Sequence, residues 1–411
     1  MKILHTSDWH LGRSLYGKKR YDEFESFLNW LIQTIIDKNI NVLIISGDIF
    51  DSGSPSNKAQ ELYYKFLYEI SKTSCKYVIA VAGNHDSPSF LNAPKELLKI
   101  LNVYIVGSIP ENIEDEVITI YKDNKPKLII CAVPYLRDKE IRTVEPGETI
   151  ESKNQKLVEG IKNHYLDVVS YAVKIRNKFA NNTDHFIPII ATGHLFTTGG
   201  KTVDGDGVRE LYVGTLSYVD ENAFPAEIDY LALGHLHIPQ TVGDNEHIRY
   251  SGAPIPMGFG EASQTKKLVL LEIKENKLNI DEISVPTFQI LSKISGDIEK
   301  ITSNILKLKN TDTNAWLEIE YTGAKHIPDL KEYLEGLVEG SKLEILRIRN
   351  KIISDKILNK MAEDEILEDL SPIDVFVRYL DAVNITEDRE ELITLYKEIV
   401  NHINEEDINA Q

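Results

Sequence analysis

Cysteine is the rarest residue type in this 411-residue chain. Only Cys75 and Cys131 are present, which excludes a disulfide framework and favours a reducing compartment. No apolar run approaches the roughly 18 residues that a membrane span needs. The N-terminus reaches Asp8 without the apolar stretch of a signal peptide. These absences predict a cytoplasmic protein with no membrane partner.

An excess of basic residues is also missing. The formal net charge is −18, which taken alone argues against a nucleic-acid partner. The distribution of charge changes this interpretation, because residues 1–100 carry a net charge of +1 and residues 351–411 carry −10. The acidity is concentrated in a C-terminal tail, so the sequence does not exclude a phosphate-rich substrate for the body.

The first 285 residues show alternating strand and helix patterns. Between the first two predicted strands an amphipathic stretch predicts a helix over Asp22–Asn39. After the second strand, Asn57 and Gln60 form a possible capping box for a helix that ends near Lys72. This alternation predicts an α/β fold whose sheets are covered by helices. The predicted strands are Lys2–His5, Val42–Ser46, Tyr77–Ala82, Leu128–Val133, Ile187–Thr192, Tyr230–Leu233 and Lys267–Ile273.

A second pattern begins near Pro286 and predicts a small α+β domain of βαβαβ order. The sequence after residue 350 predicts an acidic linker and a helical segment. We therefore expect three parts, over residues 1–285, 286–350 and 351–411. The elements predicted in the second part are Phe288–Ser295, Asp297–Lys309, Trp316–Tyr321, Pro328–Gly340 and Lys342–Arg349.

Polar residues that can bind metals follow five of the predicted strands. In open α/β sheets, ligands collect outside the carboxyl ends of the strands, so these segments can converge on one crevice. The histidines alone are five of the eleven in the chain. The residues concerned are Asp8 and His10, then Asp48 and Asp51, then Asn84, His85 and Asp86, then His194, and finally His235 with His237.

The chemistry of this set points to divalent metal ions. Carboxylate, amide and imidazole ligands without a thiolate suit Mn²⁺, Fe or Zn²⁺. Seven or eight ligands are too many for one ion, but they suit two ions that share a carboxylate, as in phosphoester hydrolysis. A single histidine after a strand would more often be a turn or core residue, whereas five such segments together favour a metal centre.

The five motifs D-x-H, GD-x-x-D, GNHD, GH and GH-x-H, in this order, resemble the calcineurin-like metallophosphoesterases. The phrases HTSDWHLG, GDIFD, AGNHD, GHLH and YSGAP more closely resemble the SbcD family of DNA-repair nuclease subunits. The resemblance implies a β-sandwich flanked by helices, followed by a capping domain and a helical segment. It implies Mn²⁺-dependent 3′-to-5′ exonuclease activity on double strands and endonuclease cutting of single strands and hairpins. It also implies an SbcC-type ATPase partner.

Roles for individual residues follow from this resemblance. The first ion site would consist of Asp8, His10, Asp48 and His237, and the second of Asp48, Asn84, His194 and His235, with Asp48 bridging. His85 would act on the phosphate in catalysis. Asp51 would hydrogen-bond the His85 ring and hold it charged, unless it is only a turn residue. Asp86 is equally well explained as structural.

A basic stretch next to the first ligands is a candidate contact to the DNA backbone. It contains Arg13, Lys18, Lys19 and Arg20, which could equally be a solvated loop. Two other functions stay open, a phosphoesterase for small nucleotides or phosphoproteins and a non-catalytic scaffold. The presence of every expected ligand argues against a scaffold. A cap and a tail have no evident use on a small substrate.

Helical surfaces provide the predicted partner contacts. The resemblance implies a homodimer within a heterotetramer, and residues of 57–72 and 90–101 are the candidates for the dimer contact, although such apolar residues more often belong to the core of the chain itself. In the tail, Ser371 and Pro372 predict the start of one amphipathic helix and Thr386 that of another. Such short helices are marginal alone. They could dock on the protein's own body or, as the SbcD resemblance implies, on the coiled-coil base of the partner ATPase, and we expect residues 351–411 to bind the ATPase. The apolar residues are Leu62, Tyr63, Phe66, Leu67, Leu97, Leu98 and Leu101 for the dimer, and Ile373, Phe376, Val377, Leu380, Leu392, Leu395, Tyr396 and Ile399 in the tail.

Overall fold

The structure is a computed structural model of the chain. It describes residues 1–142, 147–180, 186–198, 200, 219–243, 245–325, 327–351, 373–374, 376–377, 380 and 389–397. The chain divides into two compact units, Met1–Ile290 and Leu291–Gln411. Among the described residues, no helix combines the length and the apolar character that crossing a membrane requires.

Two six-stranded sheets form the centre of the first unit. The β1 sheet has the order β14-β13-β1-β4-β5-β6, and the β10 sheet has the order β11-β12-β10-β9-β8-β7. Four neighbouring strands are parallel in each sheet, and the remaining ones are antiparallel at the edges. In the β1 sheet the strands are β1 (Lys2–Thr6), β4 (Val42–Ser46), β5 (Tyr77–Val81), β6 (Val103–Val106), β13 (Lys267–Lys274) and β14 (Lys277–Ser284). In the β10 sheet they are β7 (Val117–Lys122), β8 (Lys125–Cys131), β9 (Ile189–His194), β10 (Tyr230–Gly234), β11 (Gln240–Val242) and β12 (Asn245–Tyr250).

The two sheets pack face to face, which confirms the expected β-sandwich. Alternate side chains of β4 enter different cores, because successive residues of a strand point to opposite faces. Val42 and Ile44 join residues of the β10 sheet such as Tyr230 in the core between the sheets. Leu43 and Ile45 join the core under the helices. A strand buried on both faces explains the continuous apolar run of β4.

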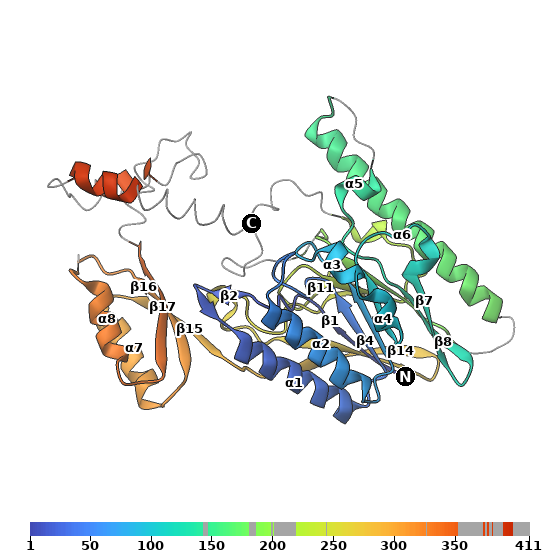
Figure 1. The fold of residues 1–411 in the computed structure, drawn as a ribbon, viewed down its shortest axis with the longest axis horizontal. Helices are drawn as coiled ribbons and strands as arrows, with labels where there is room; N and C mark the ends of the chain where they lie inside the picture. Colours follow the sequence, from blue (N-terminus) through green and yellow to red (C-terminus); the bar gives the residue numbers. More distant parts are fainter. Residues whose placement is uncertain are drawn as a thin grey trace. The chain divides into compact units, whose positions relative to one another are not determined.

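Helices cover the outer faces of the sandwich. Helices α1 (Tyr21–Lys38) and α2 (Asn57–Ser71) pack on the β1 sheet, and the 31-residue α6 (Ile150–Ala180) packs on the β10 sheet. Figure 1 shows α1 and α2 side by side, with α6 apart from them. The cap of α2 differs from the prediction, since the hydroxyl of Ser56, rather than Asn57, accepts the Ala59 N–H. Shorter elements are the β2–β3 hairpin (Ser14–Leu15, Lys18–Lys19), α3 (Pro88–Asn92), α4 (Lys95–Lys99), α5 (Asp138–Ile141), η1 (Ile113–Glu116), η3 (Glu221–Ala223) and η4 (Phe259–Glu261).

The second unit has the expected order of strands and helices. Its three-stranded sheet has β16 in the centre and β17 parallel to it. Alternate apolar residues of β16 form a separate core with the two helices. The elements are β15 (Ile290–Gly296), α7 (Ile298–Asn310), β16 (Ala315–Tyr321), α8 (Leu330–Val338) and β17 (Leu343–Asn350).

The tail is described only in part. Phe376 and Tyr396 stack with ring centroids 4.1 Å apart and an interplanar angle of 3°, so the two predicted apolar stripes do touch. Leu380 is buried, whereas Leu395 is 52% exposed. The predicted helix starts at Ser371, Pro372 and Thr386, as well as Ile399, lie outside the described residues.

Candidate metal centre

The seven predicted metal ligands lie together at one edge of the sandwich. They follow the carboxyl ends of five parallel strands, three from the β1 sheet and two from the β10 sheet. Most of them are almost fully buried, while Asn84 is half-buried. The ligands after β1, β4 and β5 are Asp8, His10, Asp48 and Asn84, and those at the ends of β9 and β10 are His194, His235 and His237.

Donor atoms of the first ion site converge from both sheets. The Nε2 atoms of His10 and His237 are 3.2 Å apart. His10 Nε2 lies 3.5 Å from Asp48 Oδ2. Asp8 offers a carboxylate oxygen within 4.8 Å of the histidine donors. This half of the centre can therefore surround one ion.

Donor atoms of the second ion site are equally close. Asn84 Oδ1 lies 3.0 Å from His194 Nε2 and 3.1 Å from His235 Nδ1. His194 Nε2 lies 3.2 Å from Asp48 Oδ2. The same oxygen of Asp48 thus faces histidines of both sites, which is the position of a bridging ligand.

These spacings fit divalent ions. Neighbouring ligands bonded at about 2.1 Å to an octahedral ion lie about 3 Å from one another. The donors are carboxylate, amide and imidazole, with no thiolate among them, a set that suits Mn²⁺, Zn²⁺ or Fe. The chemistry and the distances agree, so these residues could hold two metal ions.

The backbone at the ligands is in an unusual conformation. Asp8, His10 and Asp48 have φ of 52°, 47° and 51°, and His235 has φ of 101°. Non-glycine residues rarely adopt positive φ, and such conformations cluster at functional sites. Hydrogen bonds between the β1 and β4 loops maintain them, since the Asp8 N–H donates to Gly47 O and the His10 N–H to Asp48 O, both at 3.0 Å.

Close packing fixes the carboxylate of Asp48. A Cβ atom at Gly83 would lie 2.1 Å from Asp48 Oδ1, so only glycine leaves room there. The backbone N–H of His85 donates to the same oxygen at 2.9 Å. With Oδ1 held by the protein backbone, Oδ2 remains directed at the histidines of both ion sites.

The histidines differ in what holds their second ring nitrogen. His194 Nδ1–H donates to the backbone carbonyl of Ser46 at 2.9 Å. His10 Nδ1 lies 3.3 Å from the Asp51 carboxylate, and His237 Nδ1 lies 3.5 Å from the Glu261 carboxylate. Each contact orients a ring so that Nε2 faces the metal centre.

Neighbouring histidines favour the ionised forms of Asp48 and Asp51. Burial alone would raise the pKa of Asp48, but the charges of His194 and His10 lower it well below the usual range. Burial likewise opposes ionisation of Asp51, and its contact with His10 lowers the pKa. The carboxylates of Asp48 and Asp51 can therefore bind a cation without first releasing a proton.

His85 lies beside the ligands, but Asp51 holds it differently from the prediction. The Nδ1 atom of His85 donates to the backbone carbonyl of Asp51 at 2.9 Å, not to its carboxylate. The carboxylate instead faces His10 and Arg13. Asp51 is therefore a positioning residue for His10 through its side chain and for His85 through its backbone. His85 is half-buried, with its ring centroid 4.9 Å from that of His10.

The basic stretch is only partly available to a ligand. Arg20 is buried and ion-paired with Glu23 at 2.8 Å, so its prediction as a DNA contact was wrong. Arg13 pairs with Asp51 at 3.2 Å. Lys19 is exposed and Lys18 half-buried on the β2–β3 hairpin.

Asp86 has a structural role. Its buried carboxylate accepts the backbone N–H groups of Ile49, Phe50 and Gly83 at 2.9–3.1 Å. This network ties the β4 loop to the β5 loop. Burial, followed by repulsion from Asp48, raises the pKa of Asp86 to about 6.

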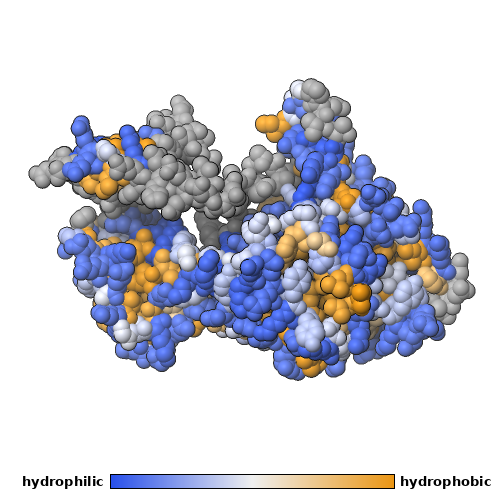
Figure 2. Space-filling view, viewed as in Figure 1, coloured by the Kyte–Doolittle hydropathy of each residue, from blue (hydrophilic) through white to orange (hydrophobic). Residues whose placement is uncertain are grey.

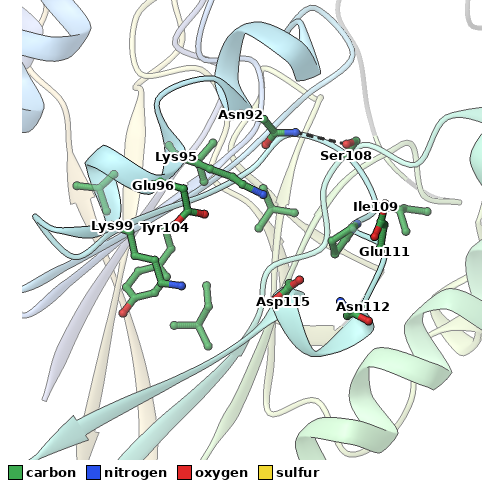
Figure 3. A pocket seen from close by; sticks show the side chains of 15 residues that line it. Asn92, Lys95, Glu96, Lys99, Tyr104, Ser108, Ile109, Glu111, Asn112 and Asp115 are labelled. Carbon is green, nitrogen blue, oxygen red and sulfur yellow. Dashed lines mark hydrogen bonds between the residues drawn. The ribbon is translucent and has the colours of Figure 1, made fainter.

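Two pockets differ in their relation to these residues. A cavity of about 440 Å³ lies between α4, β6 and η1 (Figure 3), and none of its lining residues is a predicted ligand. A pocket of about 60 Å³ opens beside His194 and His235, with Tyr135, Leu136 and Phe196 in its wall. The second ion site therefore borders on apolar side chains.

Sequence reasoning missed three supporting groups, namely Glu261, the carbonyl of Ser46 and the pairing of Arg13 with Asp51. Glu261 lies in η4, after β12 and far from the strand-end motifs. No residue pattern links it to His237 before the chain folds. A backbone carbonyl has no sequence signal at all.

Comparisons with known proteins agree with the motifs. The model of the "Calcineurin-like phosphoesterase" family matches residues 1–239, and that of the "Type 5 capsule protein repressor C-terminal domain" matches residues 287–384. The chain is 34% identical over 394 residues to the D subunit of the nuclease SbcCD from Escherichia coli K12, covering 95% of each. It is 30% identical to the proteins of the same name from Bacillus subtilis, covering 78% of each, and Staphylococcus epidermidis, covering 80% of this chain and 81% of the relative.

Proposed function

This chain belongs to the calcineurin-like phosphoesterases and, among them, to the family of SbcCD nuclease D subunits, and we propose that it is the Mn²⁺-dependent nuclease of an SbcC-type complex. It is a metal-dependent phosphodiesterase. The proposed reactions are 3′-to-5′ exonuclease cleavage of double strands and endonuclease cleavage of single strands and hairpins. The proposed setting is DNA repair in the cytoplasm.

The position of Asp48 carries this proposal. Its Oδ2 lies 3.5 Å from His10 Nε2 and 3.2 Å from His194 Nε2. One carboxylate oxygen is therefore close to a ligand of each ion site. Two ions that share a carboxylate supply a hydroxide nucleophile and neutralise charge that develops on the phosphate. We assign Asp8, His10, Asp48 and His237 to the first ion and Asp48, Asn84, His194 and His235 to the second.

His85 is the proposed general acid. Its Nδ1–H is committed to the Asp51 carbonyl, which leaves Nε2 to act on the substrate. A proton held at Nε2 can be given to the leaving oxygen of the phosphodiester or can stabilise charge on the phosphate. Asp51 holds the ring in this orientation without touching the substrate.

DNA would approach over the β2–β3 hairpin. Lys18 and Lys19 extend from the chain a few residues after His10, where phosphate contacts would position a strand without reading its sequence. We assign residues 1–285 to the nuclease domain and residues 286–350 to a cap that controls access of DNA.

The exposed apolar residues available for the proposed dimer contact lie on and just after α4, not on the apolar face of α2. Leu62, Tyr63, Phe66, Leu67 and Leu98 are buried in the first unit, so they are core residues rather than dimer contacts. Exposed apolar side chains occur at Leu97, Ile100 and Leu101. Figure 2 shows hydrophobic surface over this part of the molecule. A homodimer within a heterotetramer would cover them.

The main test compares substrates at fixed Mn²⁺. Linear duplex, a DNA hairpin and small nucleotide phosphoesters are incubated with the purified chain, with and without an SbcC-type ATPase. We expect cleavage of the DNA substrates and its loss on chelation. Cleavage confined to the small phosphoesters would contradict the nuclease proposal.

The proposed role of the tail has its own test. Deletion of residues 351–411 should abolish co-purification with the ATPase while metal binding and basal single-strand cleavage continue, because all predicted ligands lie before residue 238. A truncated chain that still bound the ATPase at full affinity would refute this role.

A further inference from the structure

A buried ion pair lies behind His237 and is separate from the ligand set. Glu261 is 0% exposed and Lys266 is 4% exposed. Oε2 of Glu261 accepts the N–H of Met257 at 3.0 Å and pairs with the Lys266 ammonium. The other carboxylate oxygen, Oε1, lies 3.5 Å from His237 Nδ1.

The geometry directs Glu261 at one histidine. Among the described residues, Oε1 has no hydrogen bond within the usual distance limits. Its contact with a polar group is the one to His237 Nδ1 at 3.5 Å. His237 Nε2 points the other way, toward His10 Nε2 at 3.2 Å. A carboxylate at Nδ1 selects the tautomer with the proton on Nδ1 and leaves the Nε2 lone pair for a metal ion.

Lys266 holds both the carboxylate and the loop that carries the histidine. Its ammonium donates to the backbone carbonyl of His237 at 3.0 Å and to the side-chain oxygen of Gln264 at 3.2 Å. An unpaired buried carboxylate would be strongly unfavourable, and the lysine compensates its charge. The pair thus connects the segment after β12 to the end of β10.

We propose that Glu261 and Lys266 are positioning residues that set the metal affinity of the first ion site through His237. The inference rests on the proposed two-metal function and adds a pair of residues outside the ligand set. Because His194 of the second ion site is held by the Ser46 carbonyl, loss of the pair should weaken the first site selectively.

The test is Glu261→Gln, which keeps the shape of the side chain and removes its charge. Mn²⁺ binding is measured by titration calorimetry, and electron paramagnetic resonance distinguishes single from coupled Mn²⁺ ions. Affinity at the first site should fall by about 10–100-fold, while the second site keeps its affinity. The coupled signal should then need correspondingly more Mn²⁺, and excess Mn²⁺ should restore the cleavage rate.

Glu23→Gln is the matched control. It removes the same charge from another buried ion pair, that of Glu23 with Arg20, which contacts no predicted ligand. The control should lose stability in thermal unfolding and bind two Mn²⁺ ions normally. Lys266→Met is the second variant, and it should weaken the first site in the same direction even where Glu261→Gln folds poorly.

The outcomes separate this inference from the proposed function. Wild-type protein that binds fewer than two Mn²⁺ ions would overturn the two-metal function itself. Wild type with two ions, together with a folded Glu261→Gln or Lys266→Met variant of unchanged affinity, would overturn only the inference. An equal loss at both sites would also overturn it, because that pattern indicates a general loss of structure.

Discussion

The two halves of the metal centre are supported by different kinds of groups. At the first ion site, both histidines are backed by carboxylates, and each carboxylate has its own cation, Arg13 for Asp51 and Lys266 for Glu261. At the second site, His194 is backed by a neutral backbone carbonyl. A carboxylate raises the basicity of the imidazole that it contacts, so we expect the first site to depend more on side-chain charge.

The surroundings of the two sites also differ in charge. His10 of the first site precedes the hairpin that carries Lys18 and Lys19 by only four residues of chain, whereas the second site borders the apolar pocket of Tyr135 and Phe196. A backbone carbonyl cannot be replaced by mutation, so the second site is less easily altered one residue at a time. Asp48 belongs to both halves.

Replacement of the shared ligand Asp48 should impair both ion sites, so that they no longer differ in Mn²⁺ affinity. In Asp48→Ala both ion sites lose an oxygen, so we expect neither to bind Mn²⁺ normally. Cleavage should fall by at least about 10³-fold, because metal polarisation contributes several kcal/mol to transition-state stabilisation. Calorimetry and a DNA cleavage assay measure the two effects. Two ions bound at wild-type affinity would show that Asp48 is not the bridge.

His85→Ala should leave Mn²⁺ binding at both ion sites intact and strongly reduce DNA cleavage. The side chain is no ligand in our assignment, so two Mn²⁺ ions should still bind while cleavage falls by about 10²–10⁴-fold. The comparison variant is His247→Ala, which removes an exposed histidine and should be fully active. A loss of metal from His85→Ala would mean that its role is misassigned.

Asp51→Asn should lower Mn²⁺ affinity at the first ion site only. The amide keeps the backbone carbonyl that holds His85 but weakens the support of His10, so Mn²⁺ affinity at the first site should fall by about 10-fold or more. Asp37→Asn, which removes an exposed carboxylate on α1, is the control. Equal weakening of both sites in the titration would remove the contrast between them.

The smallest effect is expected at the hairpin. Lys19→Gln should weaken DNA binding a few-fold and lower the salt dependence of binding by about one unit of slope, as for the loss of one phosphate contact. Mn²⁺ binding should not change. Lys274→Gln removes the same charge from the end of β13 and should leave the salt dependence unaltered. An unchanged slope for Lys19→Gln would exclude it from the DNA contacts.

The convergence of the proposed ligands could be predicted from the sequence because short-range patterns encode it. Each ligand lies at the end of an apolar strand or within a few residues after it, and parallel strands must bring their carboxyl ends to one edge. The strand β4 was predicted with its observed bounds, since it is buried on both faces. The supports of the ligands could not be predicted in this way, because Glu261 meets His237 only after the segment between them, which includes β11 and β12, has folded back.

The strand β14, which was not predicted, lacks a strong apolar pattern. It alternates between half-buried and exposed residues, as edge strands often do, so it gave little hydrophobic signal. The antiparallel edges also show that strand–helix alternation describes only the parallel centre of each sheet. Arg20 was wrongly placed in the DNA contacts because its burial depends on Glu23 and α1.

The location of the ligands on both sheets has a consequence for stability. Any ion held by His10 and His237 joins a residue that follows the β1 sheet to one that follows the β10 sheet. It therefore acts as a cross-link between the two layers, in a chain whose two cysteines are buried, unpaired and unable to supply one. Bound metal would raise the melting temperature by favouring the folded state. Chelation would therefore have two effects. It would stop hydrolysis, and it would remove the link between the two sheets at the edge that carries the ligands.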